Sequence, residues 1–124
     1  MREILFRGKC VSDGHWVHGL LISIGGELSM LTSNNGLDRA YPVLSETVGQ
    51  YTGLADKNGR KIFEGDIVKY KEHILQVEYA EEYASYFFHN NGSVIGECTA
   101  KYTKEYAEII GNIHDNPELL EVTQ

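Results

Sequence analysis

The sequence has few of the features that identify secreted, disulfide-linked or membrane-spanning proteins. Its 124 residues include 2 cysteines and 2 prolines, and no apolar run approaches the roughly 18 residues of a spanning helix. The first residues also lack the continuous apolar segment of about 7–15 residues found in signal peptides. Cys10 and Cys98 are far apart and neither lies in a CxxC motif, so we expect two reduced, structural thiols. We therefore expect a cytoplasmic protein with no membrane association.

Positive charge is also scarce. Lys and Arg total 11 against 18 Asp and Glu, which gives a net charge of -7. Residues 1–61 carry seven basic and six acidic residues, whereas residues 62–124 carry four basic and twelve acidic ones. Nucleic-acid binding without sequence preference depends on clustered cations, so this composition disfavours it. The acidic half either keeps a small protein soluble or attracts a basic partner.

Turn and strand residues are abundant by comparison. Three Asn-Gly pairs, Asn35-Gly36, Asn58-Gly59 and Asn91-Gly92, lie among β-rich runs and predict hairpins, because both residues tolerate positive φ. Helix is expected only as a short turn or helical piece ending at Tyr106, which a strand through His114 follows, and as a short C-terminal helix that Asn116 caps and Pro117 begins. The sequence therefore predicts a mostly β protein.

Histidine and carboxylate spacings do not predict a metal site. His15 and His18 are three residues apart on an expected strand, so their rings point to opposite faces. Residues 56–59 are similar to the start of a calcium loop, but the twelfth residue, Ile67, is not acidic, and a hairpin turn explains them better. We expect no metal and no cofactor.

Catalytic motifs are not found either. Neither cysteine has a setting that would activate it, and no Gly-x-Ser-x-Gly motif or phosphate-binding glycine loop occurs. Carboxylate pairs such as Glu64/Asp66 and Glu81/Glu82 are expected by chance among eighteen acidic residues. We expect no catalytic residue and no enzymatic activity.

Aromatic residues are dense between residues 79 and 88. Five occur there: Tyr79, Tyr83, Tyr86, Phe87 and Phe88. The charged residues among and beside them are Glu78, Glu81 and Glu82, which would repel phosphates, so a base-stacking platform is not predicted. We predict that these rings pack in the core and on the faces of a sheet.

Three segments resemble one protein family. Residues 50–68 read QYTGLADKNGRKIFEGDIV and resemble the signature "QYTGL-D-NG-IYEGDIV" of the YopX family, small proteins of bacteriophages and prophages. Residues 2–7, REILFR, resemble its opening "IKFRAW", and residues 110–120, IGNIHDNPELL, resemble its closing "IGNIYENPELL". The chain has Gly8-Lys9-Cys10 where the family commonly has Ala-Trp-Asp. The resemblance spans essentially the whole chain.

The resemblance implies a fold but no chemistry. It implies a mostly β protein with a small SH3-like barrel, additional β-hairpins and a short C-terminal helix. Residues 1–124 are expected to form one YopX-like domain, with a possible internal division into a β subdomain over residues 1–46 packed on a barrel over residues 47–124. The family implies no activity, cofactor or catalytic residue.

The resulting functional prediction is a phage or prophage accessory protein. We expect a non-enzymatic module that binds an unidentified host or phage protein in the bacterial cytoplasm. The sequence is also compatible with assembly into a homo-oligomer. The alternative is a nucleic-acid-linked role, by DNA binding or by acidic mimicry of DNA that acts on a host DNA-binding protein. The surface candidates for binding come from the signature: Tyr51, Asp56, Asn58, Glu64 and Asp66. A structural interpretation of the signature competes with this one, because residues 56–59 and 64–66 are typical of tight turns.

Overall fold

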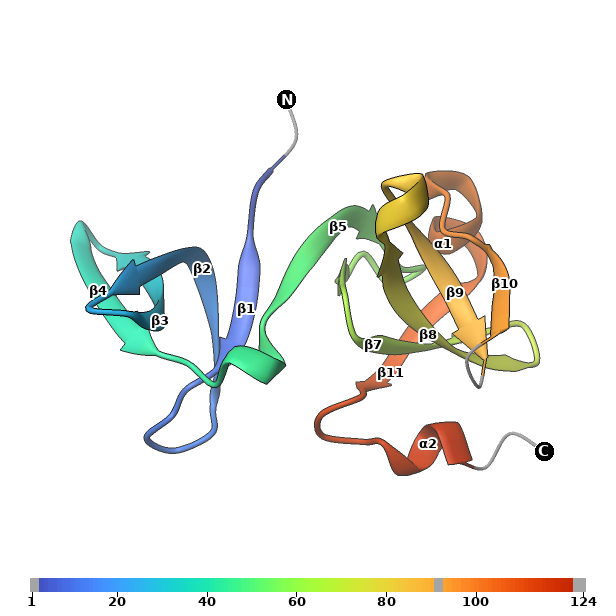
Figure 1. The fold of residues 1–124 in the computed structure, drawn as a ribbon. Helices are drawn as coiled ribbons and strands as arrows, with labels where there is room; N and C mark the ends of the chain where they lie inside the picture. Colours follow the sequence, from blue (N-terminus) through green and yellow to red (C-terminus); the bar gives the residue numbers. More distant parts are fainter. Residues whose placement is uncertain (1–2, 91–92, 122–124) are drawn as a thin grey trace. The chain divides into compact units, whose positions relative to one another are not determined.

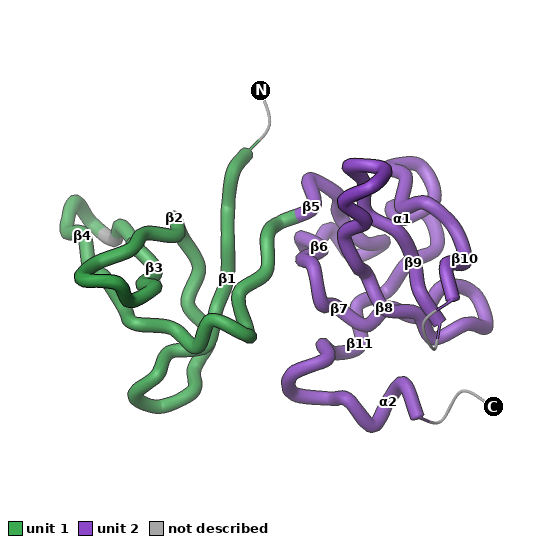
Figure 2. Tube along the Cα trace, viewed as in Figure 1, with its two compact units in different colours: residues 1–51 green, residues 52–124 purple. Residues whose placement is uncertain are grey.

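A computed structural model describes residues 3–90 and 93–121, and strands make up most of it (Figure 1). The mostly β class predicted from the sequence is confirmed. The chain divides into two compact units, unit 1 with residues 1–51 and unit 2 with residues 52–124 (Figure 2). The expected internal division lay after residue 46, whereas the boundary of the structure falls within a strand, β5 (Gly49–Ala55).

Unit 1 is an antiparallel sheet in the order β4-β3-β2-β1, to which the first residues of β5 add a further strand. These strands are β1 (Phe6–Lys9), β2 (Trp16–Ile24), β3 (Glu27–Asn34) and β4 (Leu37–Pro42), and the short 3-10 helix η1 (Ser45–Thr47) follows them. Between β3 and β4, Asn35 and Gly36 have φ values of 52° and 80°, as a two-residue type I′ turn requires. The hairpin predicted at the first Asn-Gly pair is confirmed. Val17, Met30 and Val43 form the buried core of this unit.

Unit 2 contains a five-stranded antiparallel sheet in the order β10-β9-β8-β7-β11. Its elements are β6 (Lys61–Phe63), β7 (Asp66–Tyr70), β8 (His73–Ala80), the 3-10 helix η2 (Glu81–Tyr83), β9 (Ser85–Asn90), β10 (Ser93–Glu97), α1 (Ala100–Tyr106), β11 (Ala107–Asn112) and α2 (Glu118–Glu121). Strand β6 pairs with β5. Consecutive strands of the five-stranded sheet lie side by side from β7 to β10, and β11 returns beside β7 (Figure 1).

The sheet of unit 2 turns one face towards the core. Successive side chains of a strand point to opposite faces, and in β8 the buried ones are Leu75 and Val77. Val77 lies directly opposite Phe88 of β9, and the two are 0% and 5% exposed. Val68 and Ile109 join the same buried cluster. The neighbouring residues of β8 and β9 therefore point to the outer face of the sheet.

Two of the three Asn-Gly predictions can be checked. At the second pair, the Asp56 amide donates to the carbonyl oxygen of Arg60 at 2.8 Å and Gly59 has a φ of 80°, so the predicted turn is confirmed. The third pair, residues 91–92, lies outside the described residues. The residues that flank it, Asn90 and Ser93, lie opposite each other in the pairing of β9 with β10.

The helical predictions near the C-terminus are confirmed, with two differences in detail. A helix ends at Tyr106 and a strand follows at once, but β11 ends at Asn112 rather than at His114. The predicted C-terminal helix is α2. The side-chain oxygen of Asn116, expected to cap this helix, instead accepts a hydrogen bond from the Asn112 amide at 3.2 Å.

The larger sheet of unit 2 is open in the part of the chain that the structure describes. Strands β10 and β11 form its two edges, and no closed barrel is found among these residues. The SH3-like barrel therefore stays a prediction. None of the helices in residues 3–90 and 93–121 is long and apolar enough to cross a bilayer.

Candidate functional site

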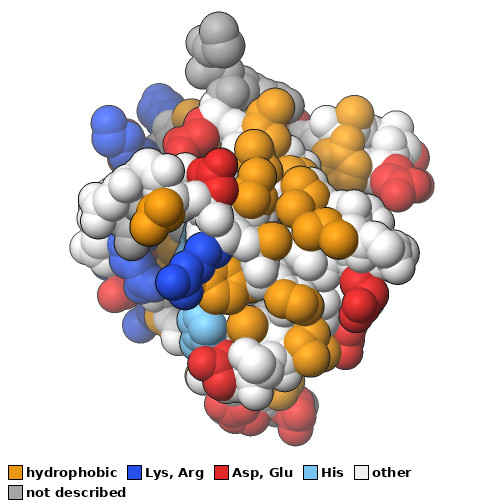
Figure 3. Space-filling view, turned by 90° about the vertical axis from the view of Figure 1, so that its left-hand side faces the viewer, with side chains coloured by type: hydrophobic (Ala, Val, Ile, Leu, Met, Phe, Trp, Pro, Cys, Tyr) orange, Lys and Arg blue, Asp and Glu red, His pale blue; other side chains and the backbone are white. Residues whose placement is uncertain are grey.

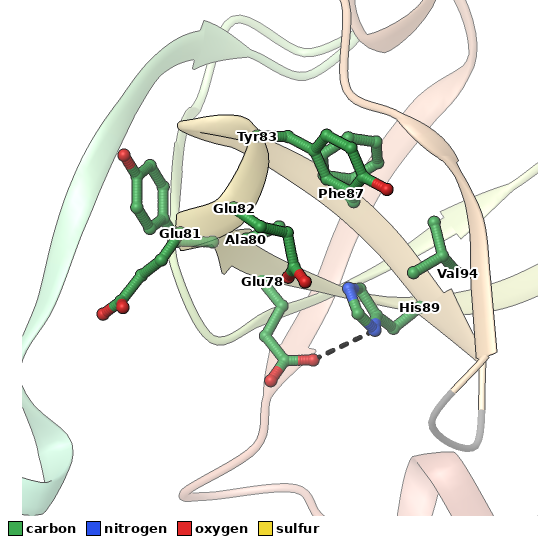
Figure 4. Close-up of a pocket in the computed structure, with 9 residues that line it drawn as sticks. Glu78, Ala80, Glu81, Glu82, Tyr83, Phe87, His89 and Val94 are labelled. Atoms are coloured by element: carbon green, nitrogen blue, oxygen red, sulfur yellow. Dashed lines mark ion pairs between the residues drawn. The ribbon is translucent and has the colours of Figure 1, made fainter.

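A pocket of about 410 Å³ lies where β8 turns through η2 into β9 (Figure 4). This volume is within the usual range for sites that take a small molecule. Its lining combines acidic, aromatic and histidine side chains, chiefly Glu78, Glu81, Glu82, Tyr83, Phe87 and His89. We call this feature the acidic–aromatic pocket.

Strand register explains why these side chains meet. Residues directly opposite each other in an antiparallel pair point to the same face. Glu78 lies opposite Phe87, and His89 lies opposite both Gln76 of β8 and Val94 of β10. Because Val77 and Phe88 point into the core, these neighbours point outwards. Three strands thus supply the floor of the pocket.

The connection between β8 and β9 supplies the remaining wall. Glu81, Glu82 and Tyr83 form the single turn of η2, which closes when the Ala84 amide donates to the carbonyl oxygen of Glu81 at 3.2 Å. Ala84 then takes a left-handed conformation, with φ 51° and ψ 44°. This conformation is uncommon for a residue with a Cβ, and it lets the chain reverse directly into β9. Two consecutive carboxylates are thereby placed at the end of the sheet.

His89 is the most enclosed polar group of the pocket. Its Nδ1 lies 3.2 Å from Oε2 of Glu78. Since a carboxylate accepts hydrogen bonds, neutral His89 carries its proton on Nδ1 and leaves the lone pair on Nε2. Nε2 is buried, is turned towards Glu82 in Figure 4, and has no hydrogen-bond partner among the residues that the structure describes. The pocket therefore holds an unused acceptor.

Two aromatic rings form the opposite end of the pocket. The centroids of Tyr83 and Phe87 are 5.5 Å apart with an angle of 56° between the ring planes. Tyr83 is 70% exposed, so solvent reaches one face of this pair. Aromatic faces attract cations, best where neighbouring carboxylates add to the negative potential.

The electrostatic character of the pocket is uniform. Its charged lining residues are the three carboxylates Glu78, Glu81 and Glu82, and neither Lys nor Arg is among the described residues that line it. Glu78 and Glu82 turn towards His89, whereas Glu81 points away from them (Figure 4). The pocket presents acceptors and ring faces, and its complement is a positively charged group with several donors.

A second pocket of unit 2, of about 300 Å³, contains lysines but is not cationic. Lys57, Lys69 and Lys71 share it with two glutamates and Tyr106. Lys57 Nζ lies 3.6 Å from a carboxylate oxygen of Glu108, and Lys71 Nζ lies 4.6 Å from the ring centroid of Tyr106. Carboxylates beside the lysines weaken their attraction for phosphate, so this pocket is a poor nucleic-acid site.

Two of the surface candidates from the sequence are wrong. Asp56 and Asp66 are each 1% exposed. Asp56 accepts hydrogen bonds from the amides of Asn58 and Arg60, both at 2.9 Å, and from the amide of Ile109 at 3.0 Å. Asp66 accepts one from the Phe63 amide at 2.7 Å. These carboxylates are inside because each replaces water around backbone N–H groups that the turns leave unpaired.

The other three candidates are accessible to different degrees. Asn58 is exposed at the tip of its turn, Glu64 is half-buried in the turn before β7, and Tyr51 is half-buried in β5. Asn58 and Glu64 do not line the acidic–aromatic pocket. Gly65, beside Glu64, has a φ of 92° and confirms the tight turn predicted there. Much of the signature is thus explained by folding.

Residues that could hold a metal ion are brought together in unit 1. The sequence predicts His15 and His18 on one strand, but His15 lies in the loop that precedes β2. The structure instead gathers donor atoms of Cys10, Asp13 and His15 within 4.8 Å of one another. The second cysteine, Cys98, is buried, and burial, with a smaller contribution from Glu97, raises the pKa of its thiol to about 12.

The aromatic residues between positions 79 and 88 divide into rings that pack in the core, as the sequence predicts, and rings that line the pocket, which it does not predict. Phe88 packs in the core, and Tyr86 packs against it, as predicted. Phe87 and Tyr83 line the pocket, and the glutamates noted for repelling phosphates line it with them. The alternation in β9, which puts residues 87 and 89 on the face opposite to residue 88, is the signal that could have separated the two groups.

The exposed apolar residues that the structure describes form no assignable site. Leu20, Ile24 and Leu37 of unit 1 are 50%, 55% and 69% exposed. Figure 3 shows hydrophobic side chains at the surface on the face it presents. Exposed apolar residues are common on folded domains and need no special explanation.

Comparison with known proteins gives a family but no activity. A search of curated proteins found no match. The chain is similar in structure to protein EF1440 from Enterococcus faecalis, known from a crystal structure, with a TM-score of 0.59, 23% identity, and coverage of 97% of this chain and 99% of that one. The family described as "YopX protein" matches residues 12–121. This chain therefore belongs to the YopX protein family.

Proposed function

We propose that this chain is a non-enzymatic protein-interaction module, and that its acidic–aromatic pocket binds an arginine side chain of a partner protein. The observation that carries the proposal is the chemistry of the lining. The carboxylates of Glu78 and Glu82 and the free Nε2 of His89 accept hydrogen bonds, and the rings of Tyr83 and Phe87 offer faces to a cation. A guanidinium group has five N–H donors, no acceptor and a planar shape that stacks on aromatic rings.

Arginine fits this lining better than lysine does. A lysine ammonium is a compact, strongly hydrated charge, whereas a guanidinium can lie on a ring and still donate in its own plane to two acceptors. Glu78 and Glu82 turn towards His89 at one end of the pocket, and the ring pair lies at the other end (Figure 4). In the proposed complex, one guanidinium stacks on the ring pair and donates to Glu78 and Glu82.

A non-enzymatic role is supported by what the pocket is made of. The described residues that line it include no Ser, Thr, Cys or Lys, so the His89–Glu78 pair has no aliphatic hydroxyl, thiol or amine beside it to activate. The phage or prophage association, the bacterial cytoplasm as location and the SH3-like barrel are proposed on the resemblance. For the barrel, the return of β11 beside β7 is further support, because it brings the last strand of the sheet next to the first.

The nucleic-acid alternative receives less support. The three lysines that share a pocket have glutamates among them, and the carboxylates of the acidic–aromatic pocket come from one hairpin rather than from an extended array. We expect duplex DNA to remain unshifted by the purified protein at about 50 mM salt. Tight DNA binding that weakens along a steep log–log salt slope would favour the alternative.

Amide chemical shifts of the labelled full chain test where a cationic probe binds. We expect a tri-arginine peptide to perturb the amides of β8, η2 and β9 in a saturable way, and a tri-glutamate peptide to perturb none of them. Shifts spread evenly over the acidic residues of unit 2, or no shifts at all, would contradict the proposal.

A pair of tyrosine variants separates the pocket from general surface effects. Tyr83→Ala should weaken binding of the peptide by about fivefold or more, because it removes one ring face without touching the core. Tyr102→Ala is the matched control: Tyr102 is 48% exposed on α1, outside the pocket, and its removal should leave the affinity unchanged.

A further inference from the structure

The loop between β1 and β2 is a tight hairpin held by backbone hydrogen bonds. The Cys10 amide donates to the carbonyl oxygen of His15 at 2.8 Å, and the Gly14 amide donates to the carbonyl oxygen of Cys10 at 2.9 Å. Gly14 has a φ of 77°, which a glycine adopts without strain. Cys10 is also paired with Val43 in an antiparallel bridge. The two ends of the loop, Cys10 and His15, are therefore fixed beside each other.

Three side chains of this loop offer metal-ligating atoms at one point. The Cys10 sulfur, a carboxylate oxygen of Asp13 and a ring nitrogen of His15 all lie within 4.8 Å of one another. A tetrahedral zinc ion with ligand distances of about 2.0–2.3 Å holds its donor atoms roughly 3.3–3.8 Å apart. The donors are thus close to the spacing that such an ion needs, and small side-chain rotations complete it.

We propose that Cys10, Asp13 and His15 form a binding site for a divalent transition-metal ion of the zinc type. Thiolate, imidazole and carboxylate are the ligands that zinc uses in proteins, and the mixture of sulfur and nitrogen selects against magnesium and calcium. Three protein ligands leave a fourth tetrahedral position for water. The site replaces the expectation that this chain binds no metal, which was based on His15 and His18.

The surroundings suit an ion that enters from solvent. Cys10 is 3% exposed and supplies the inner ligand, while the side chains of Asp13 and His15 are 61% and 50% exposed and can close over the ion. Without metal, Asp13 and His15 hydrogen-bond to each other through Oδ1 and Nδ1, and this bond lowers the pKa of Asp13. The ion takes the place of that hydrogen bond.

The rest of the loop holds the ligands in position. The His15 amide donates to Asp13 Oδ1 at 3.1 Å, and the His15 ring packs edge-on against Tyr41 at 6.1 Å between centroids. Ser12 Oγ lies 3.3 Å from the Cys10 sulfur, where it can donate to a thiolate.

On metal binding, the Cys10 S–H bond breaks, a sulfur–metal bond forms from the same electron pair, and the proton passes to the buffer. Metal binding should therefore weaken as the pH falls.

Cobalt(II) absorption tests the site directly, because cobalt replaces zinc and reports its ligands. Titrated into the reduced, chelator-treated full chain, Co²⁺ should give the visible absorption bands of a tetrahedral complex together with a near-ultraviolet thiolate-to-cobalt band. Both should saturate at one equivalent of Co²⁺ per chain. Zn²⁺ should abolish both. Absence of these bands, or a weak octahedral spectrum with no thiolate band, would overturn the proposal.

Variants assign the ligands. Cys10→Ser should remove the thiolate band, and His15→Gln and Asp13→Asn should each lower cobalt affinity by about tenfold or more. The matched controls are Cys98→Ser and His18→Gln, which should leave the spectrum unchanged. Should Cys10→Ser fail to fold by circular dichroism, the exposed His15 and Asp13 variants decide. An unchanged affinity in both would overturn the assignment.

Discussion

Asp56 accepts three backbone hydrogen bonds while only 1% of it is exposed. Two of the donors, Asn58 and Arg60, belong to its own turn, and the third, Ile109, lies fifty-three residues further along the chain in β11. One carboxylate thus fixes a turn and also ties it to β11, an edge strand of the five-stranded sheet. Hydrogen bonds to a charged acceptor stabilise more than neutral ones do, and buried donors left alone are costly.

The variant Asp56→Ala should lower the free energy of unfolding by about 2–4 kcal/mol, because three N–H groups lose their acceptor. Urea denaturation followed by circular dichroism measures the change. Glu72→Ala is the control, since Glu72 is an exposed carboxylate on the turn before β8; we expect its effect to stay within about 0.5 kcal/mol. Equal changes in the free energy of unfolding for the two variants would contradict the structural role of Asp56.

The single residue Cys98 makes the free energy of unfolding depend on pH. Burial raises the pKa of its thiol from about 9 to about 12 in the folded chain, so between these values the folded state binds more protons than the unfolded state. Stability should fall as the pH rises through this window, with a contribution from Cys98 of up to about 1.4 kcal/mol per pH unit. Urea unfolding at about pH 8 and about pH 10 should show a smaller loss for Cys98→Ala than for the natural chain. Identical losses would show that Cys98 ionises freely when folded.

Among the elements, the connection from β8 to β9 links local structure most closely to the proposed function. A hairpin of this kind needs a reversal within a few residues, and here a single 3-10 turn provides it. The reversal ends at Ala84 in the left-handed region, where a residue with a Cβ is strained. The same turn places Glu82 and Tyr83 over the outer face of the sheet.

Replacing Ala84 by glycine should therefore raise the free energy of unfolding by about 1 kcal/mol, since glycine takes this conformation without strain. Thermal unfolding measures it. Ala80→Gly is the matched control: Ala80 has a φ of -105°, so glycine there should lower stability by about 0.5–1 kcal/mol. A destabilising effect of Ala84→Gly equal to that of the control would contradict the strained turn.

The elements themselves were largely predictable from the sequence. Asn-Gly pairs, the alternation in residues 74–79 and the glycine at position 65 are local signals, and local chemistry determines a turn or a strand wherever it is found. The burial of Asp56 and Asp66 was not predictable in this way. It depends on which backbone amides the tertiary fold leaves unpaired, and the Ile109 amide comes from a distant strand.

The candidate pocket was predictable only as a list of residues. The sequence shows that residues 78–89 mix glutamates with aromatic rings, but the mixture is equally compatible with a packed sheet face. What assembles the pocket is the pairing of β8 with β9 and the turn between them, because register decides which rings face the core and which face outwards. The Cys10, Asp13 and His15 cluster was missed for a similar reason, since a loop does not obey the alternation of a strand.

At the scale of the whole molecule, the uneven charge has a specific consequence. Twelve of the 18 acidic residues lie in residues 62–124, so any cation is attracted to this half to some degree. Attraction by net charge is long-ranged and is screened by salt, whereas a guanidinium seated between Glu78, Glu82 and the two rings is held by short contacts that salt weakens less. Variants that change the net charge equally at different places separate these two effects.

The most direct test of the proposed function is calorimetric titration of a tri-arginine peptide into two double variants of equal net charge. Glu78→Gln with Glu82→Gln removes two carboxylates from the pocket, and Glu72→Gln with Glu118→Gln removes two exposed ones elsewhere in unit 2. We expect the pocket variant to weaken binding by about tenfold or more and the control to weaken it by less than about twofold. Equal weakening by both variants would show that net charge alone attracts the peptide, and would contradict the assignment of the pocket as its binding site.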